Sequence, residues 1–376
     1  MPYPTHAPKI ALAVALGLTS AALPALANAQ DIIKIGHAAG TSGTAAHLGK
    51  DNENGARMAV EELNAKGVVI GGKKYKIVLQ AEDDASDPKQ GTAVAQKLVD
   101  AKVNGVIGHQ VSGTTIPASR IYFNAGIPQI SPSASNPQYT RQRFNSAFRN
   151  IANDEQQGAA LARYALQNVK AKRIAVIDDR TAYGKGLADE FSKNIKRLGP
   201  AAGAAIVSTQ YTNDKATDFN AILTTVKATK PDLVFYGGMD AVAAPMLRQM
   251  KQLGFPVKFM GGDGMNDDQV LCAEAGGVAP AQEKALTDFK AAYKKRFGVE
   301  VQTYAPQTYD ALMTMVDAMQ QAGSPDPVKY LPYLAKINHK GVTGDISFDA
   351  RGDIKDGALT IFTFQKGKRV KVAVVK

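Results

Sequence analysis

Cysteine is almost absent from this chain: of its 376 residues, only Cys272 is a cysteine. One thiol cannot form an intramolecular disulfide, so the fold has to be stabilised by its apolar core. A metal site built from paired cysteines is excluded for the same reason. Residues 270–273 form a short apolar run typical of a buried strand, in which cysteine behaves as a small apolar side chain rather than as a nucleophile.

The motifs of the common catalytic machineries are missing as well. The sequence contains no G-x-x-x-x-G-K-[ST] phosphate loop, no G-x-S-x-G nucleophile elbow and no H-E-x-x-H zinc motif. His37 and His109 both follow expected strands and could form a metal or acid–base pair, but hydrogen-bonded structural histidines are the better interpretation. Asp83 and Asp84 could hold a cation, yet neighbouring strand residues point to opposite faces, which favours a solvated acidic turn. We therefore expect no enzyme activity, no cofactor and no metal.

The charge pattern does not point to nucleic acid. The chain has 45 Lys and Arg against 34 Asp and Glu, a net charge of +11 that is spread along the sequence without a dense basic run. Nucleic acid is therefore not an expected partner. Heptads and long polar tracts are also lacking, which argues against coiled-coil and disordered classes. With 45% hydrophobic residues, the chain can bury one large core or two ordinary ones.

The N-terminal segment has the pattern of an export signal. A weakly positive start is followed by an apolar run over residues 10–22, and Ala27-Asn28-Ala29 supplies the small residues that a signal peptidase accepts. The run is too short for a membrane anchor. The pattern predicts a cleaved signal peptide over residues 1–29 and a mature chain in the periplasm.

Short β-branched runs alternate with amphipathic helices in the rest of the chain. The first unit has expected strands at 32–36, 74–81, 105–108 and 127–131, and expected helices at 51–65, 89–101 and 116–124. The rhythm restarts with strands at 173–178, 205–209, 233–236 and 257–260, and helices at 186–198, 218–227 and 244–253. This alternation predicts an α/β fold of two doubly wound lobes, each around a mostly parallel sheet.

The C-terminal part has too few strands for a sheet of its own. Helices are expected at 282–297, 309–322 and 329–337, and strands at 345–348 and 359–376. We expect these helices to pack on the first lobe and the terminal strands to join the second. The chain would then cross between lobes near residues 150–154, 272–275 and 344–347. Lobe 1 would comprise residues 30–152 plus 275–345, and lobe 2 would comprise residues 153–274 plus 346–376.

Hydroxyl-rich loops follow several of the expected strands, where ligands of open α/β sheets bind. Ser112, Gly113 and Thr114 precede a helix that would carry Pro117 in its first turn. Free amides and the positive helix end would suit a carboxylate or phosphate, although ordinary N-capping is the alternative.

A second loop, residues 131–135, contains Ser133 and Ser135. Its carbonyl and hydroxyl oxygens would suit an ammonium group. The alternative is a serine-rich turn without a ligand.

The order and spacing of seven segments carry a family resemblance. They are residues 49–67, which end in Glu62-Leu63-Asn64-Ala65-Lys66-Gly67, and Asp83-Asp84-Ala85-Ser86-Asp87-Pro88-Lys89-Gln90, Val106-Ile107-Gly108-His109, Ile130-Ser131-Pro132-Ser133-Ala134-Ser135, Tyr183-Gly184-Lys185-Gly186-Leu187, Tyr236-Gly237-Gly238 and Phe259-Met260-Gly261-Gly262-Asp263-Gly264. With them the chain resembles the leucine/isoleucine/valine-binding proteins of ABC importers.

The resemblance implies a type I periplasmic binding protein architecture with three interlobe crossovers. A free amino acid, with leucine, isoleucine and valine as first choice, would be held between two closing lobes and delivered to the permease subunits of an ABC importer in the inner membrane. The protein would be a monomer. Alternatives with the same fold are a protein that binds another amino acid, an amide or an aromatic acid, and a ligand-sensing receptor domain.

The resemblance also implies a role for individual residues at the two ends of the amino acid. Ser112 with the following amides would hold the α-carboxylate, and Ser135 would contact both the carboxylate and the ammonium group. The Ser133 carbonyl would accept a hydrogen bond from the ammonium group. Asp263 would supply the counter-charge, with Asp240 as the second choice.

Other positions concern the closing lobe and the side-chain pocket. Tyr183 would close over the ligand from the second lobe. Leu48 and Met239 replace tyrosines that often line the pocket in this family, and Asp263 is one methylene shorter than the glutamate common there. The segment after Gly264 is also shortened. We therefore expect the family's recognition of the amino-acid backbone together with an altered side-chain pocket.

Overall fold

The computed structural model describes residues 1–4, 31–265, 271–275, 282–365 and 368–375. The predicted signal peptide over residues 1–29 lies outside the described residues apart from its first four. The chain from Asp31 onward forms one compact unit. Within the described part of the chain, no helix is long and apolar enough to cross a membrane.

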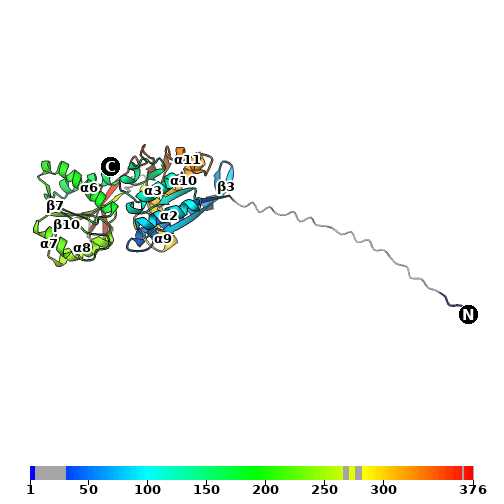
Figure 1. Cartoon of the computed structure of the whole chain (residues 1–376), viewed down its shortest axis with the longest axis horizontal. Helices are drawn as coiled ribbons and strands as arrows, with labels where there is room; N and C mark the ends of the chain where they lie inside the picture. The colour runs from blue at the N-terminus through cyan, green and yellow to red at the C-terminus, as the bar shows by residue number, and fades with distance from the viewer. Residues whose placement is uncertain (5–30, 266–270, 276–281, 366–367, 376) are drawn as a thin grey trace. The chain divides into compact units, whose positions relative to one another are not determined.

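The first sheet, of which Figure 1 labels β3, has the strand order β2-β3-β1-β4-β5-β6 and is parallel except for the β2–β3 pair. Its strands are β1 (Asp31–Ala39), β2 (Val68–Ile70), β3 (Lys73–Asp83), β4 (Gly105–Gly108), β5 (Gln129–Ser131) and β6 (Ala147–Arg149). Val106 and Ile107 are neighbours in β4 and belong to the apolar clusters on opposite faces of the sheet. Helices therefore cover both faces, as expected for a doubly wound lobe.

Four helices of the first lobe lie between these strands. They are α1 (Ala46–Lys66), α2 (Pro88–Asp100), α3 (Ser112–Asn124) and the short α4 (Gln138–Arg141). The start of α2 follows from local chemistry: Asp87 accepts the Gln90 N–H at 2.9 Å, and Pro88 occupies the first helical position, where no amide donor is needed.

The second sheet has the order β15-β14-β11-β10-β9-β7-β8. Its strands are β7 (Arg173–Asp178), β8 (Ala205–Tyr211), β9 (Leu233–Gly237), β10 (Lys258–Gly261), β11 (Leu271–Ala275), β14 (Leu359–Gln365) and β15 (Lys368–Val375). Helices α5 (Asp154–Gln167) and α6 (Ala182–Leu198) pack on one face, and α7 (Asn220–Ala228) and α8 (Asp240–Gln252) pack on the other. The second lobe is therefore doubly wound as well.

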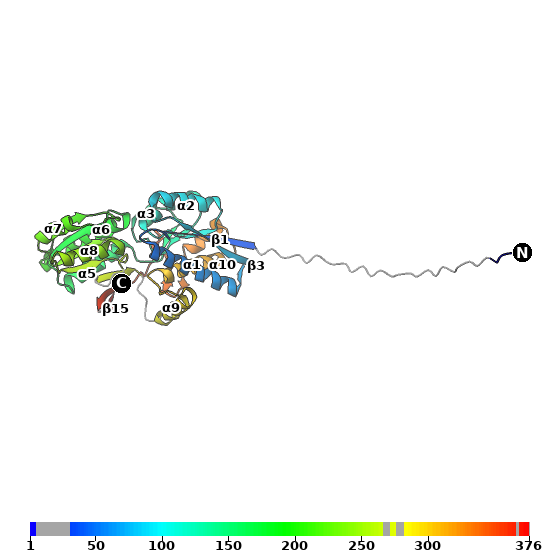
Figure 2. The same ribbon diagram turned by 90° about the horizontal axis from the view of Figure 1, so that it is seen from below.

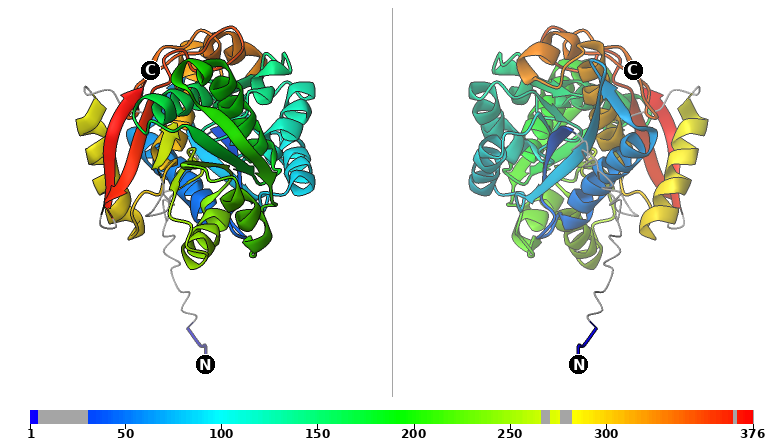
Figure 3. Two further views of the ribbon diagram at one scale, coloured as in Figure 1. Left: turned by 90° about the vertical axis from the view of Figure 1, so that its left-hand side faces the viewer. Right: turned by 90° about the vertical axis from the view of Figure 1, so that its right-hand side faces the viewer.

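The C-terminal helices return to the first lobe, as predicted. They are α9 (Glu283–Phe297), α10 (Ala305–Gln321) and α11 (Pro327–Leu334), and all three contribute to the apolar core that also contains α1. Figure 2 shows α10 beside α1. The red strands β14 and β15 run next to the yellow helix α9 in both views of Figure 3, and Lys371 Nζ lies 3.5 Å from Glu283 Oε1.

Three sequence predictions need correction. Helix α5 was not predicted at all, because the strand before it, β6, has only three residues and gives no β-branched run. Helix α3 begins at Ser112 rather than at residue 116, which moves Pro117 from the first turn into the helix interior. The predicted strand at 359–376 is a hairpin of two strands, β14 and β15.

The third crossover also lies later than predicted. Residues 345–348 do not join the second sheet: β13 (Asp345–Ile346) pairs with β12 (His339–Lys340), and Ile346 and Phe348 are packed in the first core. Since β14 begins at Leu359, the chain changes sheets between residues 349 and 358. Apart from this boundary, the division into lobes remains a prediction.

A buried ion pair joins the first and third crossovers. The fully buried Arg149, at the end of β6, donates from Nη2 to Asp353 Oδ1 at 2.7 Å and from Nε at 3.0 Å. Asp353 Oδ2 accepts from Arg141 at 2.6 Å and from Asn153 Nδ2 at 3.0 Å. Although burial acts to raise the pKa of Asp353, the two arginines lower it to about 2.

We expect Asp353→Asn to destabilise the protein by about 3 to 5 kcal/mol, the range for removing one partner of a buried ion pair. Arg149 would keep a buried charge without its carboxylate. Denaturant unfolding at pH 7 measures the effect, with the exposed Asp356→Asn as a control that should stay within about 0.5 kcal/mol of wild type. Because the folded-state pKa of Asp353 is depressed, its contribution is present above about pH 4 and is lost as pH falls through 2. A variant as stable as the control would contradict the prediction.

Candidate functional site

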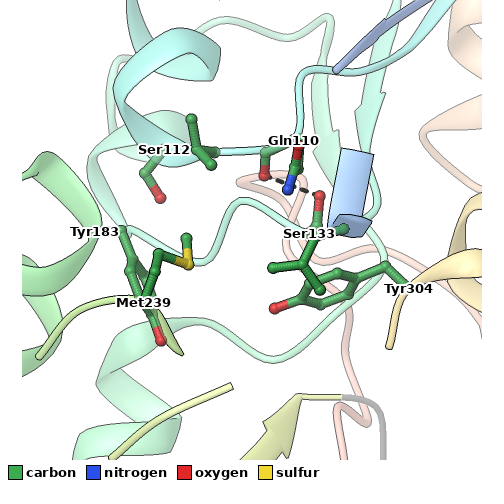
Figure 4. Close-up of a pocket in the computed structure, with 8 residues that line it drawn as sticks. Gln110, Ser112, Ser133, Tyr183, Met239 and Tyr304 are labelled. Atoms are coloured by element: carbon green, nitrogen blue, oxygen red, sulfur yellow. Dashed lines mark hydrogen bonds between the residues drawn. The ribbon is translucent and has the colours of Figure 1, made fainter. Parts of the chain in front are cut away.

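A cavity at the carboxyl ends of the strands collects residues from both lobes. It encloses about 250 Å³ of empty space, part of it open to solvent (Figure 4). The lining residues are Leu48, Gln110, Val111, Ser112, Ser133, Tyr183, Met239 and Tyr304. Five of them, Leu48, Ser112, Ser133, Tyr183 and Met239, were predicted as ligand contacts, and the structure brings these five together.

The N-terminus of α3 forms one side of the cavity. Ser112 is 1% exposed, and its Oγ accepts the Asn136 N–H at 3.2 Å, which leaves its own proton free to be donated. Thr114 instead donates its hydroxyl to the Val111 carbonyl at 3.1 Å. Neither Thr114 nor Gly113 is among the lining residues. Only the serine of the predicted anion-binding loop therefore presents its side chain here.

The two serines of the second loop differ in their partners. Ser133 Oγ accepts a hydrogen bond from Asn52 Nδ2 at 3.1 Å and donates its proton to the Gln110 carbonyl at 2.8 Å, so this hydroxyl has no proton left to donate to a ligand. Ser135 Oγ is buried and has no hydrogen-bond partner within the described ranges. The Ser135 carbonyl accepts the Asp154 N–H at 2.9 Å. A ligand would therefore meet the main chain of Ser133, whereas the Ser135 hydroxyl is unpaired.

Asp263 is buried directly after β10. Tyr183 donates its hydroxyl to Asp263 Oδ1 at 2.8 Å and accepts the Gly264 N–H at the same distance. Tyr304 donates its hydroxyl to the Asp263 carbonyl at 3.3 Å. Asp263 Oδ2 has no hydrogen-bond partner in the described part of the chain. Burial raises the pKa of Asp263 to about 6, against the opposing effect of the tyrosine hydroxyls.

Helix α5 adds two buried polar side chains that the sequence did not suggest. Asp154 is fully buried, and neither of its carboxylate oxygens has a hydrogen-bond partner among the residues that the structure describes. Burial, and after it the nearby charge of Asp263, raises the pKa of Asp154 to about 8. Gln157 is fully buried with both amide atoms unpaired in the same part of the chain. Among the described residues, unpaired acceptor oxygens outnumber donors here: two on Asp154 and one each on Gln157 and Asp263, against the Gln157 amide and the Ser135 hydroxyl, and this excess suits a cation.

The missed helix did have a sequence signature. Asn153 accepts the Gln156 N–H at 3.1 Å, and the Gln156 side chain accepts the Asn153 N–H at 3.0 Å. This reciprocal capping box is readable from the spacing Asn-x-x-Gln alone. The hydrogen bond from Tyr304 to Asp263 had no comparable sequence signal. Tyr304 lies just before α10, far from Asp263 in the sequence, and only the folded chain brings the two residues together.

Asp240 lies outside the cavity, at the start of α8. Its Oδ2 is 3.0 Å from His47 Nε2, and this hydrogen bond is the main reason why the pKa of His47 is raised. The neighbouring residue, Met239, does line the cavity. Asp240 therefore pairs with a histidine at the cleft rim, whereas the side-chain partner of Asp263 is a tyrosine hydroxyl; each carboxylate keeps one oxygen without a hydrogen-bond partner among the described residues.

His37 and His109 have structural contacts rather than a shared site. His109 Nδ1 lies 2.7 Å from Asp84 Oδ2 and its Nε2 lies 2.9 Å from the Tyr122 hydroxyl, with all three residues buried. The interpretation of Asp84 as a solvated turn was therefore wrong. His37 Nδ1 lies 3.0 Å from the Ile107 carbonyl. Among the described residues, no group of three or more His, Cys, Asp or Glu is arranged to hold a metal ion.

Comparison with known proteins identifies the family. The model of a periplasmic binding protein family matches residues 32–369. The chain belongs to this family. It is 36% identical to Leu/Ile/Val-binding protein homolog 1 of Brucella abortus over 338 residues, which cover 87% of this chain and 88% of the relative. It is 35% identical to an amino acid binding protein of Pseudomonas aeruginosa over 374 residues, which cover 96% of each chain.

A solved structure supports the same assignment. The branched-chain amino acid transporter substrate-binding protein LivJ of Streptococcus pneumoniae, determined in complex with isoleucine, superposes with a TM-score of 0.81 at 28% identity. The match covers 92% of this chain and 99% of that protein. The resemblance stated from the sequence and the type I periplasmic binding protein architecture are thereby confirmed.

We expect Asp154→Asn to stabilise the ligand-free protein in alkaline solution by about 1 to 3 kcal/mol, the range for an unpaired buried polar group. The folded-state pKa of about 8 exceeds the ordinary 3.8, so the wild-type carboxyl stabilises the fold only while protonated. That contribution is fully present below about pH 4 and is lost as pH rises through 8. Thermal melts between pH 5 and pH 9 should show the variant gaining on wild type as pH rises. A difference independent of pH would contradict the assignment of an unpaired acid.

Proposed function

We propose that the protein captures a free α-amino acid with a branched side chain, of the leucine, isoleucine and valine class, in the periplasm and delivers it to the permease of an ABC importer. The observation that carries the proposal is a cavity that Ser112 lines with a free hydroxyl proton, next to Asp263, which lies behind the lining residues Tyr183 and Tyr304 and keeps an unpaired carboxylate oxygen among the described residues. The names of the relatives and the isoleucine in the LivJ complex support the choice of ligand.

The carboxylate of the amino acid would bind at Ser112. The hydroxyl can donate a hydrogen bond, and because the Thr114 and Thr115 N–H groups already donate to the Val111 carbonyl at 3.2 and 3.0 Å, the main-chain donors for the anion would be those of Ser112 and Gly113. The positive end of the helix dipole favours an anion at the same place. The side chains of Thr114 and Thr115 are turned back to the Val111 carbonyl, which secures the start of the helix.

The ammonium group would bind between the Ser133 carbonyl, Ser135 and Asp263. A closed cleft has to provide a counter-charge for it, since burying an unpaired ammonium is costly. Asp263 Oδ2 and Ser135 Oγ are the unpaired acceptors that would take its hydrogens. Asp154 adds a second carboxyl group nearby, whose unpaired oxygens would also accept hydrogen bonds from a cation.

The lobes would close on the ligand about the three crossovers. Asn136 Nδ2 from the first lobe donates to the Ala182 carbonyl of the second at 2.6 Å, and Tyr304 of the first lobe donates to the Asp263 carbonyl of the second. Together with the His47–Asp240 pair, these contacts join the two lobes. They would form on closure and commit the ligand to the cavity.

Calorimetry with leucine, N-acetyl-leucine and leucinamide tests the recognition of both backbone ends. We expect leucine to bind and both blocked forms to bind at least about a hundredfold more weakly, because each loses a charged contact. A ligand present at 100 times its dissociation constant should add about 2.7 kcal/mol to the free energy of unfolding. Equal affinity for the three compounds would refute recognition of the free amino acid.

We expect Asp263→Asn to weaken amino-acid binding by about 2 to 5 kcal/mol with folding intact, because the buried ammonium loses its charge partner. The matched control is Asp240→Asn, whose carboxylate pairs with His47 and should matter far less. Wild-type affinity should also fall as pH drops through about 6, where Asp263 becomes protonated, and the variant should lose this dependence. Binding of the Asp263 variant within about threefold of wild type would refute the role.

A further inference from the structure

Gln110 places a buried hydrogen-bond donor in the cavity wall without a partner. The residue lies between β4 and α3, is 2% exposed and lines the cavity. Its Nε2 has no hydrogen-bond partner within the described residues, and Figure 4 shows this nitrogen directed toward the enclosed space. Nothing in the proposed recognition of the carboxylate and ammonium groups uses this donor.

The orientation of the Gln110 amide is fixed by its surroundings. Oε1 accepts the Gly40 N–H at 3.2 Å, so a flipped amide would set its NH₂ group against another donor. Gly49 leaves the room that this arrangement needs, because a Cβ at that position would lie 2.9 Å from Oε1. The main chain is held too, since the Gln110 carbonyl accepts from Ser133 Oγ at 2.8 Å. The donor therefore cannot turn away from a ligand at small cost.

The position of Gln110 relates it to the ligand's side chain. In Figure 4, Ser112 lies on one side of the cavity with Tyr183 and Met239, and Gln110 lies on the other side with Ser133 and Tyr304. If Ser112 holds the α-carboxylate and the ammonium group lies between the Ser133 carbonyl and Asp263, the side chain of the amino acid has the rest of the cavity, into which Gln110 Nε2 is directed. The apolar Leu48 also lines this cavity.

We infer that the site selects an α-amino acid whose side chain carries a hydrogen-bond-accepting oxygen, which Gln110 Nε2 recognises. The inference rests on the proposed capture of a free α-amino acid and changes the preferred side chain, from the hydrocarbons of leucine, isoleucine and valine to one of similar shape with a hydroxyl or carbonyl group. A hydrocarbon side chain packed on Gln110 would bury the donor with no partner and would lose affinity for that reason. A hydroxyl or carbonyl oxygen at the same place satisfies it.

Two pairs of ligands of matched shape test this selection by calorimetry. Threonine and valine differ by a hydroxyl in place of a methyl group, and asparagine and leucine share their branching with an oxygen at the next carbon. We expect wild type to bind the oxygen-bearing member of at least one pair about tenfold more tightly. Gln110→Met, which keeps the length of the side chain and removes the donor, should abolish or reverse that preference.

Met239→Leu serves as the control, because it changes the cavity wall without changing a donor and should shift both members of a pair alike. Wild type that prefers the hydrocarbon in both pairs would overturn the inference, whether or not Gln110→Met folds. An unchanged ratio of affinities in a folded Gln110→Met would overturn it as well. Failure of the proposed function is distinguishable, since then neither these amino acids nor free leucine would bind.

Discussion

The burial of two carboxyl groups without a cation is the constraint on which the cleft depends. Asp154 and Asp263 have unpaired oxygens in a place from which water is removed, and the pKa of each is raised, mainly by burial. A closed cleft without ligand must either keep protons on these groups or bear the cost of unpaired charge. Under the proposed function, the ammonium group of the ligand would remove that cost and supply the missing partner of the closed form. Tyr304 would link this balance to closure, because it donates from the first lobe to the Asp263 carbonyl of the second.

Asp353, another buried acid nearby, shows that burial alone does not decide whether the pKa of a carboxyl group is raised or lowered. Asp353 has a pKa of about 2 because Arg149 and Arg141 surround it, whereas Asp154, on the helix that follows the first crossover, has a pKa of about 8. Asn153 donates to Asp353 and directly precedes Asp154. The crossover thus carries the Arg149–Asp353 ion pair, which connects its two segments. Asp154, at the candidate site, lies directly beside it without a partner among the described residues. Two neighbouring acids therefore have opposite electrostatic surroundings, one suited to stability and the other to binding a cation.

The sequence predicted the elements that have strong local patterns. Strands at residues 105–108 and 173–178 are confirmed to the residue, because each is a short apolar run bounded by polar or glycine positions. A three-residue strand such as β6 is too short to show a hydrophobic pattern. Because β6 was not predicted, the helix that follows it, α5, was not predicted either. The return of the C-terminal helices to the first lobe was deduced from a shortage of strands and is confirmed. The position of the third crossover was wrong, since Ile346 and Phe348 are buried in the first core rather than aligned in the second sheet.

The sequence could predict which residue types form the candidate site, but not which of their polar groups stay without a hydrogen-bond partner. Ser112 and Thr114 look equivalent in the sequence. Thr114 donates its hydroxyl to the Val111 carbonyl, whereas the Ser112 hydroxyl accepts a hydrogen bond and can still donate its proton. Ser133 and Ser135 differ in the same way. Whether a polar group is left unpaired depends on neighbours supplied by distant segments, as with Gly40 for the oxygen of Gln110. A binding site consists of the polar groups that folding leaves unsatisfied, so the residues that discriminate between ligands emerge only once the protein's internal hydrogen bonds are known.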